Sequence, residues 1–343
     1  MTTDLGSAGS DVTRPTMKDV ARSAGVSLKT VSRVVNGEPG VTEATAERVN
    51  SALSRLSFRR NDIARSLRHQ MTTSSIGLVT KDLANPFYAA LARAVGEVAY
   101  RRGFLVLSGS SDESEERERE ILTAFLGRRV DGLIVVPTGG SHAFLERERA
   151  AGVQLVFVDR PATGVSADTV LIDNAAGVAV GVRHLAQHGH RRIGYLGDRP
   201  DIYTAVERMR GYRTAVDTLG LESHPGLVCQ GLHDSAVAEE RALSMLGSSN
   251  PPTALFAGNN LITAGVLRAL RRRGDRVGLV GFDDFDLADL VDPPVTVIAQ
   301  DAETLGRRAA ERLFARLAGD DAPTVTEVLP TRLITRGSGE VRA

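Results

Sequence analysis

The feature that most constrains the fold of this chain is a series of ten apolar runs between Ser75 and Gln300, with helical segments between most of them. In chain order the runs are IGLVT, FLVLSGS, DGLIVVP, VQLVFVD, TVLID, RIGYLG, GLVCQG, TALFAGN, RVGLVGFD and VTVIAQ. Apolar strands that alternate with helices are typical of parallel sheets covered on both faces. Two successive series of about five strands therefore predict an α/β body of two doubly wound parallel-sheet subdomains. The acidic stretch DESEERERE after the second run is interpreted as the solvent-exposed start of a helix.

Residues 14–58 precede this body and have a helical period instead of strands. Thr16 can cap a first short helix and Ser27 a second, and Gly25 allows the sharp turn between them. Thr42 can cap a third helix, and apolar side chains at helical spacing provide a small core. The pattern predicts a small all-α helix-turn-helix head.

The second helix of this head is predicted to face DNA. When its apolar positions pack on the first helix, the side chains that remain outward are Leu28, Lys29, Thr30, Ser32 and Arg33. Cations near a helix N-terminus can reach guanine acceptors in the major groove, and hydroxyls can reach phosphates. The alternative is an ordinary helical hairpin on a protein surface, but the charge distribution favours DNA. Residues 14–70 contain 11 Lys and Arg against 5 Asp and Glu, whereas the other residues contain 31 against 37, and such a basic segment is expected of a phosphate-binding module.

The length of 343 residues exceeds one typical domain, and the hydrophobic fraction of 42% is sufficient for a large core. Residues 1–13 have neither a basic start nor an apolar run, so we expect a disordered tail rather than a signal peptide. No apolar stretch approaches the ~20 residues of a membrane span. Cys229 is the only cysteine and lies in a run typical of a buried strand, which excludes an intrachain disulfide and a cysteine zinc site. The HGH at 188–190 is expected to end a helix rather than bind metal. We expect a cytoplasmic protein without membrane contact, metal or cofactor.

The run from Met17 to Leu67 resembles the DNA-binding head of the lactose/galactose repressor family of transcription regulators, and matching motifs recur to about Asp301. The resemblance implies a body of periplasmic-binding-protein type and a hinge helix that lies in the minor groove beside its dimer mate. In that hinge Leu67 is implied to be an apolar wedge that unstacks a base step, and Arg68 a minor-groove cation. The residues expected to contact DNA are Thr16, Ser27, Leu28, Lys29, Thr30, Ser32, Arg33, Asn36, Asn61, Ala64, Arg65, Leu67 and Arg68.

These features predict four segments. They are a disordered tail at 1–13, the head at 14–58, a hinge helix or linker at 59–74, and an effector-binding and dimerisation body at 75–343. The body is expected to have a first subdomain at about 75–172 and 302–328 and a second at about 173–301 and 329–340. The hinge is short and only weakly amphipathic, so we expect it to become helical only on DNA; a plain basic linker is the alternative.

Several predicted strands end in side chains suited to ligand contact. Ligands of doubly wound proteins bind beyond the carboxyl ends of the strands, and a polyhydroxylated or heterocyclic ligand requires charged groups, amides and an aromatic face. The candidate effector-binding residues are Phe87, Tyr88, Asp159, Arg160, Asp173, Arg208, His233, Asn259, Asp283 and Gln300. The family resemblance most strongly implies Arg208, Asn259 and Asp283. As alternatives, Asp173 could cap the following helix, Asp283 could fix a turn, and Phe87 could belong to the core.

The sequence thus predicts a ligand-controlled transcription regulator, most simply a repressor, that binds a pseudo-palindromic operator as a homodimer. Its effector is expected to be a sugar or related metabolite bound between the subdomains, or alternatively a nucleobase or nucleoside acting as corepressor. The chain has no Trp, so His233 is expected where many sugar binders have a tryptophan. A sugar-binding transport receptor would leave the basic head unexplained. An enzyme is disfavoured and no catalytic residue is assigned, because dinucleotide, nucleotide and hydrolase motifs are missing.

Overall fold

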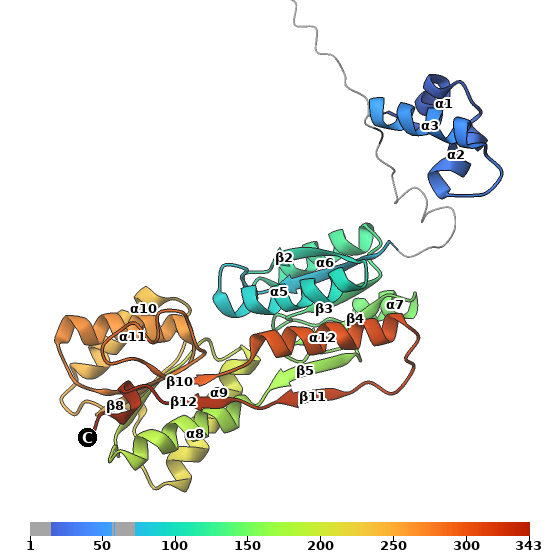
Figure 1. Ribbon diagram of the computed structural model, residues 1–343. Coiled ribbons are helices and arrows are strands. Elements are labelled where there is room, and N and C mark those ends of the chain that lie inside the picture. The colour runs from blue at the N-terminus through green and yellow to red at the C-terminus, as the bar shows by residue number, and fades with distance from the viewer. Residues whose placement is uncertain (1–14, 57, 59–72) are drawn as a thin grey trace, which may run out of the picture. The chain divides into compact units, whose positions relative to one another are not determined.

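The structure is a computed structural model that describes residues 15–56, 58 and 73–343. The chain divides into two compact units, Met1–Met71 and Thr72–Ala343. The first contains a helical head and the second is an α/β body (Figure 1). The expected tail at 1–13 lies outside the described residues, as does nearly all of the expected hinge at 59–74.

Three short helices form the head. They are α1 Met17–Ala24, α2 Leu28–Asn36 and α3 Glu43–Arg55. Thr16 begins α1 with a capping box, in which it and Asp19 each accept a hydrogen bond from the other's backbone N–H. Gly25 ends α1 with a left-handed φ of 63°, where a Cβ would be strained, and Ser27 caps α2. The helices bury Val20, Ala21, Ala24, Val31, Val49 and Ala52 against one another, and Phe58 packs on this core. The predicted all-α helix-turn-helix head is confirmed.

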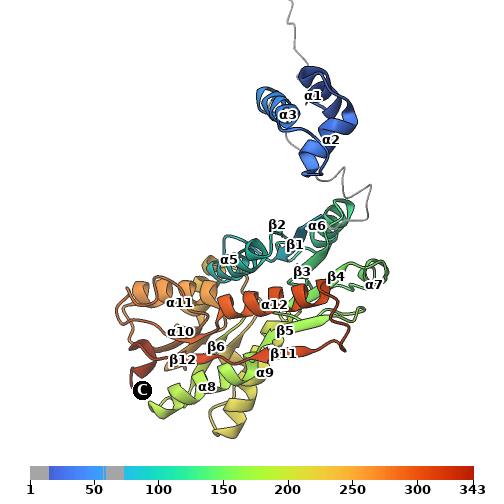
Figure 2. The same cartoon turned by 45° about the vertical axis from the view of Figure 1, so that its right-hand side comes forward.

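The body consists of two lobes, and the first lobe contains a six-stranded parallel sheet of order β11-β5-β4-β3-β1-β2. Its strands are β1 Ser75–Thr80, β2 Leu105–Ser110, β3 Gly132–Val135, β4 Gln154–Val158, β5 Asp168–Ile172 and β11 Thr326–Leu329. Helices α5 Pro86–Arg101 and α12 Ala302–Leu317 pack side by side on one face, and α6 Glu115–Gly127 and α7 Leu145–Ala150 cover the other (Figures 1 and 2). Because both faces are covered, the central strands are apolar without alternation.

The second lobe repeats this architecture with the strand order β12-β10-β9-β8-β6-β7, in which only β12 is antiparallel to its neighbour. Its strands are β6 Ile193–Leu196, β7 Val228–Cys229, β8 Ala254–Ala257, β9 Gly278–Phe282, β10 Thr296–Ala299 and β12 Arg332–Ile334. Helices α8 Asn174–Gln187 and α9 Tyr203–Thr218 cover one face, and α10 Ser235–Leu246 and α11 Asn260–Arg273 the other. Two short 3-10 turns are η1 Pro225–Leu227 and η2 Ser338–Glu340. No helix in the described part of the chain is long and apolar enough to span a membrane.

Three short crossings join the lobes. The chain leaves the first lobe between β5 and α8, returns between β10 and α12, and leaves again between β11 and β12. Strands β11 and β12 lie end to end, one in each lobe (Figure 2). The Asp173 N–H donates to the Leu329 carbonyl at 2.9 Å, which ties two of the crossings together. Joints of a few residues allow the lobes to rotate while both cores stay packed.

All ten predicted strands occur at their expected places, and the predicted architecture of two mainly parallel sheets is confirmed. β7 is much shorter than its apolar run, since only Val228 and Cys229 pair with β6. Cys229 is half-buried rather than fully buried because β7 lies at the edge of its sheet, and burial raises the pKa of its thiol.

The histidines near the HGH motif hold the end of the chain against the second lobe. Helix α8 ends at Gln187, before the motif. His190 is fully buried, with Nδ1 2.9 Å from the Thr253 hydroxyl and Nε2 donating to the Val341 carbonyl at 2.8 Å. Burial lowers the pKa of His190, which keeps the ring neutral. Among the described residues, no group of three or more His, Cys, Asp and Glu side chains could hold a metal ion.

Candidate DNA-binding helix and effector cavity

Helix α2 presents the side chains expected to reach base edges. Leu28 is 45% exposed although it is apolar, and Lys29 beside it is exposed. Arg33 lies one turn further along and is partly exposed. Val31 on the opposite side is fully buried in the head's core. The accessible side of α2 therefore carries Leu28 and Lys29 in its first turn and Arg33 in its last, an arrangement typical of a recognition helix.

The hydroxyl and amide side chains that are expected to contact DNA also make hydrogen bonds within α2 and its caps. The Ser27 hydroxyl accepts from the Thr30 N–H at 3.1 Å and lies 2.9 Å from the Thr30 hydroxyl. The Asn36 side chain donates to Glu38 at 3.0 Å and lies 3.4 Å from the Ser32 hydroxyl. These contacts fix both ends of α2. The other expected DNA contacts, Asn61, Ala64, Arg65, Leu67 and Arg68, lie outside the described residues.

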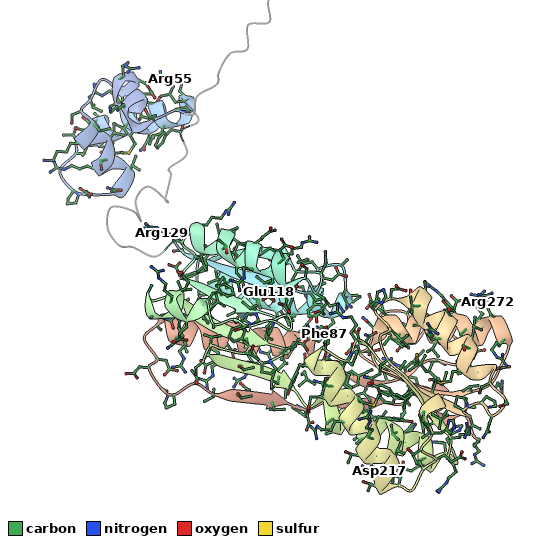
Figure 3. The ribbon with its side chains drawn as sticks, turned by 180° about the vertical axis from the view of Figure 1, so that it is seen from behind. Arg55, Phe87, Glu118, Arg129, Asp217 and Arg272 are labelled. Atoms are coloured by element: carbon green, nitrogen blue, oxygen red, sulfur yellow. The ribbon has the colours of Figure 1, made fainter. Side chains whose placement is uncertain are left out.

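A small cavity lies between the two lobes, and we call it the inner cavity. Its lining residues are Lys81, Asn85, Phe87, Tyr88, Asp159, Arg160, Asp198, Thr204, Arg208, Asn259, Asn260, Leu261, Asp283 and Gln300. Eight of the ten predicted effector residues are therefore brought together at the carboxyl ends of strands. Phe87 is half-buried and lies where the lobes meet (Figure 3), and its ring packs edge-on against that of Tyr88 with the two centroids 4.9 Å apart.

Arg208, on α9, anchors the side of the inner cavity that belongs to the second lobe. Its Nε donates to Asn174 at 2.7 Å, and its Nη1 donates to the Gly258 carbonyl at 2.6 Å. The guanidinium lies 3.8 Å from the centroid of the Phe282 ring and 3.7 Å from the Asp283 carboxylate. A guanidinium has five N–H donors, so a rigidly held Arg208 retains donors for a ligand.

Two buried carboxyl groups face this cavity. Asp283 follows β9 with a φ of 70° and accepts a hydrogen bond from the Gln300 amide. Asp159 follows β4 with a φ of 69° and accepts from the Tyr88 hydroxyl at 3.2 Å. Burial raises the pKa of both carboxyls, although the neighbouring arginines act in the opposite direction. Desolvated carboxylates gain from hydroxyl donors that a ligand supplies, and strained backbone of this kind gathers at binding sites.

Arg160 is held by a carboxylate that the sequence pattern did not indicate. Glu113 accepts two hydrogen bonds from the Arg160 guanidinium, at 2.8 and 2.7 Å. Lys81 Nζ lies 3.4 Å from the same carboxylate. Burial opposes the ionisation of Glu113, but the hydrogen bonds and charges of Arg160 and Lys81 outweigh it, so the pKa of Glu113 lies below its ordinary value. The pair thus presents Arg160 to the cavity in one fixed orientation.

The interpretation of the acidic stretch 112–120 as solvent-exposed is wrong for Glu113 and Glu118. Glu113 precedes α6 and turns inward with a φ of 59°. Glu118 is buried, and its carboxylate lies 2.5 Å from His142 Nε2. Its helical spacing from the buried Leu122 could have indicated an inward position. No local pattern distinguishes Glu113 from its exposed neighbours.

Polar contacts close one lobe on the other. Lys81 of the first lobe lies 3.6 Å from Asp198 of the second. Asn85 and Asn260 exchange amide hydrogen bonds across the same gap, at 3.1 and 3.4 Å. On the second lobe, Asn259 donates to Asp198 at 3.1 Å and caps α11. The inner cavity is thus also lined by four residues that are not among the sequence-predicted ones and through which the lobes meet, Lys81, Asn85, Asp198 and Asn260.

The inner cavity is too small for a metabolite in this closed arrangement. Its volume is about 40 Å³, whereas ligand pockets are roughly 300–1,000 Å³. A ligand can therefore enter only when the lobes move apart and the Lys81–Asp198 and Asn85–Asn260 contacts break or rearrange.

Asp173 and His233 do not lie among the other predicted effector residues. Asp173 caps α8, with its carboxylate accepting from the Ala176 N–H at 3.0 Å, as its alternative interpretation held. His233 lies before α10 with its Nε2 3.2 Å from the Asp234 carboxylate, and its side chain is 62% exposed. Neither residue lines the inner cavity, so no side chain at 233 replaces a tryptophan platform there.

Comparison with known proteins identifies the head and much of the body. Residues 16–61 match the bacterial regulatory proteins of the lacI family, and residues 182–339 match the periplasmic binding protein-like domain. The transcriptional regulator GalR of Escherichia coli is 34% identical over 327 residues, which are 94% of this chain and 95% of GalR. The transcriptional regulator CelR of Thermobifida fusca is 36% identical over 340 residues, covering 95% of this chain and 98% of CelR.

Solved structures of such regulators share this fold. The lac repressor dimer bound to operator and the anti-inducer ONPF matches with a TM-score of 0.80 and 26% identity, over 95% of this chain and 99% of that one. The complex of the transcriptional regulator CelR with cellobiose matches with a TM-score of 0.70 and 32% identity, over 95% of this chain and 100% of that one. With a helix-turn-helix head, a two-lobed body and regulators as full-length relatives, the chain belongs to the lacI family of bacterial regulatory proteins and is a DNA-binding transcriptional regulator with an effector ligand.

Proposed function

We propose that the protein is a repressor whose operator affinity is controlled by a sugar or related polyhydroxylated metabolite in the inner cavity. The observation that carries this proposal is the set of buried opposite charges there, Arg208 beside Asp283 and Arg160 beside Asp159. Hydroxyl groups both donate and accept, so one polyhydroxylated ring can satisfy carboxylates and guanidiniums together. The cellobiose complex of the related CelR supports a sugar as the ligand class.

The proposed DNA complex is a homodimer on a pseudo-palindromic operator, with one α2 in each half-site. Leu28, Lys29 and Arg33 contact base edges, and the hinge at 59–74 becomes helical in the minor groove with Leu67 as its wedge. The operator-bound lac repressor dimer supports this arrangement. We further propose that the protein works in the cytoplasm and binds its effector without converting it.

Effector control follows from the closed lobes. An effector that needs more room than about 40 Å³ changes the angle between the lobes. In a dimer that angle sets the separation at which the two hinges are held. Hinge order depends on the separation, so effector binding and operator affinity are coupled reciprocally. The same coupling serves an inducer that separates the hinges and a corepressor that brings them together.

A ligand screen on the full-length protein tests this proposal. Sugars, polyols, nucleosides and bases are compared by thermal shift, since a ligand at 100 times its Kd adds ~2.7 kcal/mol of stability. Each ligand found is then added to a titration of an operator selected from random DNA, and we expect the operator Kd to change at least fivefold. Stabilisation by a nucleobase or nucleoside instead of a sugar would replace the ligand class. A ligand that stabilises the protein without changing operator affinity would refute the control mechanism.

A further inference from the structure

A second and larger cavity, the outer cavity, lies beside the inner one. Its volume is about 520 Å³. The N-terminal ends of α5 and α12 in the first lobe and the loop after β9 in the second lobe form its walls. Phe87, Asp283 and Gln300 line both cavities. The two cavities therefore adjoin through a shared wall, and a ligand held in the inner one can extend into the outer one.

The polar groups of the outer cavity are mainly hydrogen-bond acceptors. Six carboxylates and one guanidinium line it. Three of the carboxylates already accept hydrogen bonds, Asp283 from Gln300, Asp301 from Thr304 and Glu303 from Arg93. The guanidinium, that of Arg336, is already engaged by both oxygens of Asp284 at 2.6 and 2.7 Å. Gln300 donates its amide to Asp283, while its Oε1 is buried without a hydrogen-bond partner in the described part of the chain. A ligand group here must therefore supply donors, as a hydroxyl or an ammonium does, and a phosphate or carboxylate is repelled.

Apolar side chains also line the outer cavity, beside these acceptors. Phe87 and Pro86 at the start of α5 line the outer cavity from the first lobe, and Phe285 lines it from the second. A sugar ring has polar edges and apolar C–H faces, so it can pack on an aromatic ring while its hydroxyls reach carboxylates. The exposed carboxylates of Asp286 and Asp289 lie on the loop after β9.

We propose that the outer cavity is a second effector subsite, which takes a neutral or amine-bearing second ring joined to the ring in the inner cavity. This inference rests on the proposed sugar effector and extends it. On this basis the effector is at least a disaccharide or glycoside, and an acid group on its second ring weakens binding. Asp286 and Asp289 favour donors in that ring, and Phe87 packs between the two rings.

Calorimetry on the full-length protein tests the second subsite. The probes are D-glucose, D-galactose, D-ribose and D-fructose, with cellobiose, lactose, maltose and sucrose as disaccharides. We expect one disaccharide to bind at least tenfold more tightly than either of its component monosaccharides. In the double variant Asp286→Asn/Asp289→Asn this preference should fall at least threefold, while the same disaccharide with a uronic acid as its second ring should bind more tightly than it does to the unaltered protein.

The matched control is Asp217→Asn on α9, whose side chain is exposed far from both cavities (Figure 3). It should leave all affinities unchanged. A disaccharide that binds no better than its monosaccharides overturns the outer subsite but leaves a sugar effector standing, and so does a preference that survives the double variant. Failure of every sugar to bind overturns the sugar effector and the subsite together.

Discussion

Replacement of Arg208 by Met removes a buried cation from the inner cavity, while the Met side chain keeps about the length of the aliphatic part of Arg. The variant loses two hydrogen bonds, to Asn174 and to the Gly258 carbonyl, and the attraction to Asp283 at 3.7 Å. The Arg208 and Asp283 side chains are only 8% and 9% exposed. The perturbation therefore acts on desolvated groups, where removal of one charge leaves the other without compensation.

The structure sets the size of two separate effects. Removal of one partner of a buried charge pair costs about 3–5 kcal/mol of unfolding free energy. Loss of a charged hydrogen bond to the effector costs ~1.5–3 kcal/mol of binding, and 1.4 kcal/mol corresponds to a tenfold change in Kd. We therefore expect Arg208→Met to be much less stable and to bind the effector more than tenfold more weakly.

A second variant separates stability from binding. In Arg208→Met/Asp283→Asn no buried charge of this pair remains, so part of the lost stability should return. Effector affinity should not return, because both groups that we propose as ligand contacts are changed. Urea unfolding measures the first effect, and calorimetry with the sugar found in the screen measures the second.

Arg272→Met on α11 is the control, since Arg272 is exposed and its pair with the partly buried Glu239 contributes ~0–1 kcal/mol (Figure 3). If Arg208→Met and Asp283→Asn both bind the effector as tightly as the unaltered protein, the effector does not lie in the inner cavity. If the double variant instead regains affinity along with stability, Arg208 acts on binding only through the fold.

Four further predictions concern other parts of the chain. Arg33→Ala should lose ~1–3 kcal/mol of discrimination between operator and random DNA in a competition assay, whereas an equal loss for both would identify a phosphate contact. Leu67→Ala should reduce operator bending in a circular-permutation gel, and an unchanged bend would remove the wedge. Lys81→Met and Asp198→Asn should each increase hydrogen exchange of the segments between the lobes, and the double variant should add little, because both changes remove the same contact; exchange unchanged in the single variants would show that this pair does not hold the lobes together. The pKa of His190 is lowered in the folded protein, so the unfolded chain takes up the proton first as the pH falls, and stability should fall below pH 6.5. If the urea midpoint of His190→Gln depends on pH as steeply as that of the unaltered protein, His190 is not the cause.

The sequence alone determined the elements and many of the site residues. Each apolar run is a local signal, because a strand buried on both faces must be apolar along its whole length. Parallel strands end at one edge of their sheet, so Asp159, Asp283 and Gln300 could be assigned to the ligand site from their positions after such runs. Most of the head was equally predictable, because the caps of Thr16 and Ser27 and the turn glycine act within a few residues, whereas Thr42 begins α3 without a side-chain cap hydrogen bond.

The tertiary structure alone decided how the two halves of the site meet. Glu113 reaches Arg160 over 47 residues, and Asn85 reaches Asn260 over 175. No periodicity in the sequence encodes such pairs, because the first forms only when the first lobe has folded, and the second only when the three crossings have also set the relative position of the lobes. Asp173 and His233 stay outside the site for local reasons, since Asp173 caps its helix and His233 is exposed to solvent. The closure of the lobes sets the volumes of the inner and outer cavities, because these depend on the distance between the facing surfaces of the two lobes rather than on the residues of either surface.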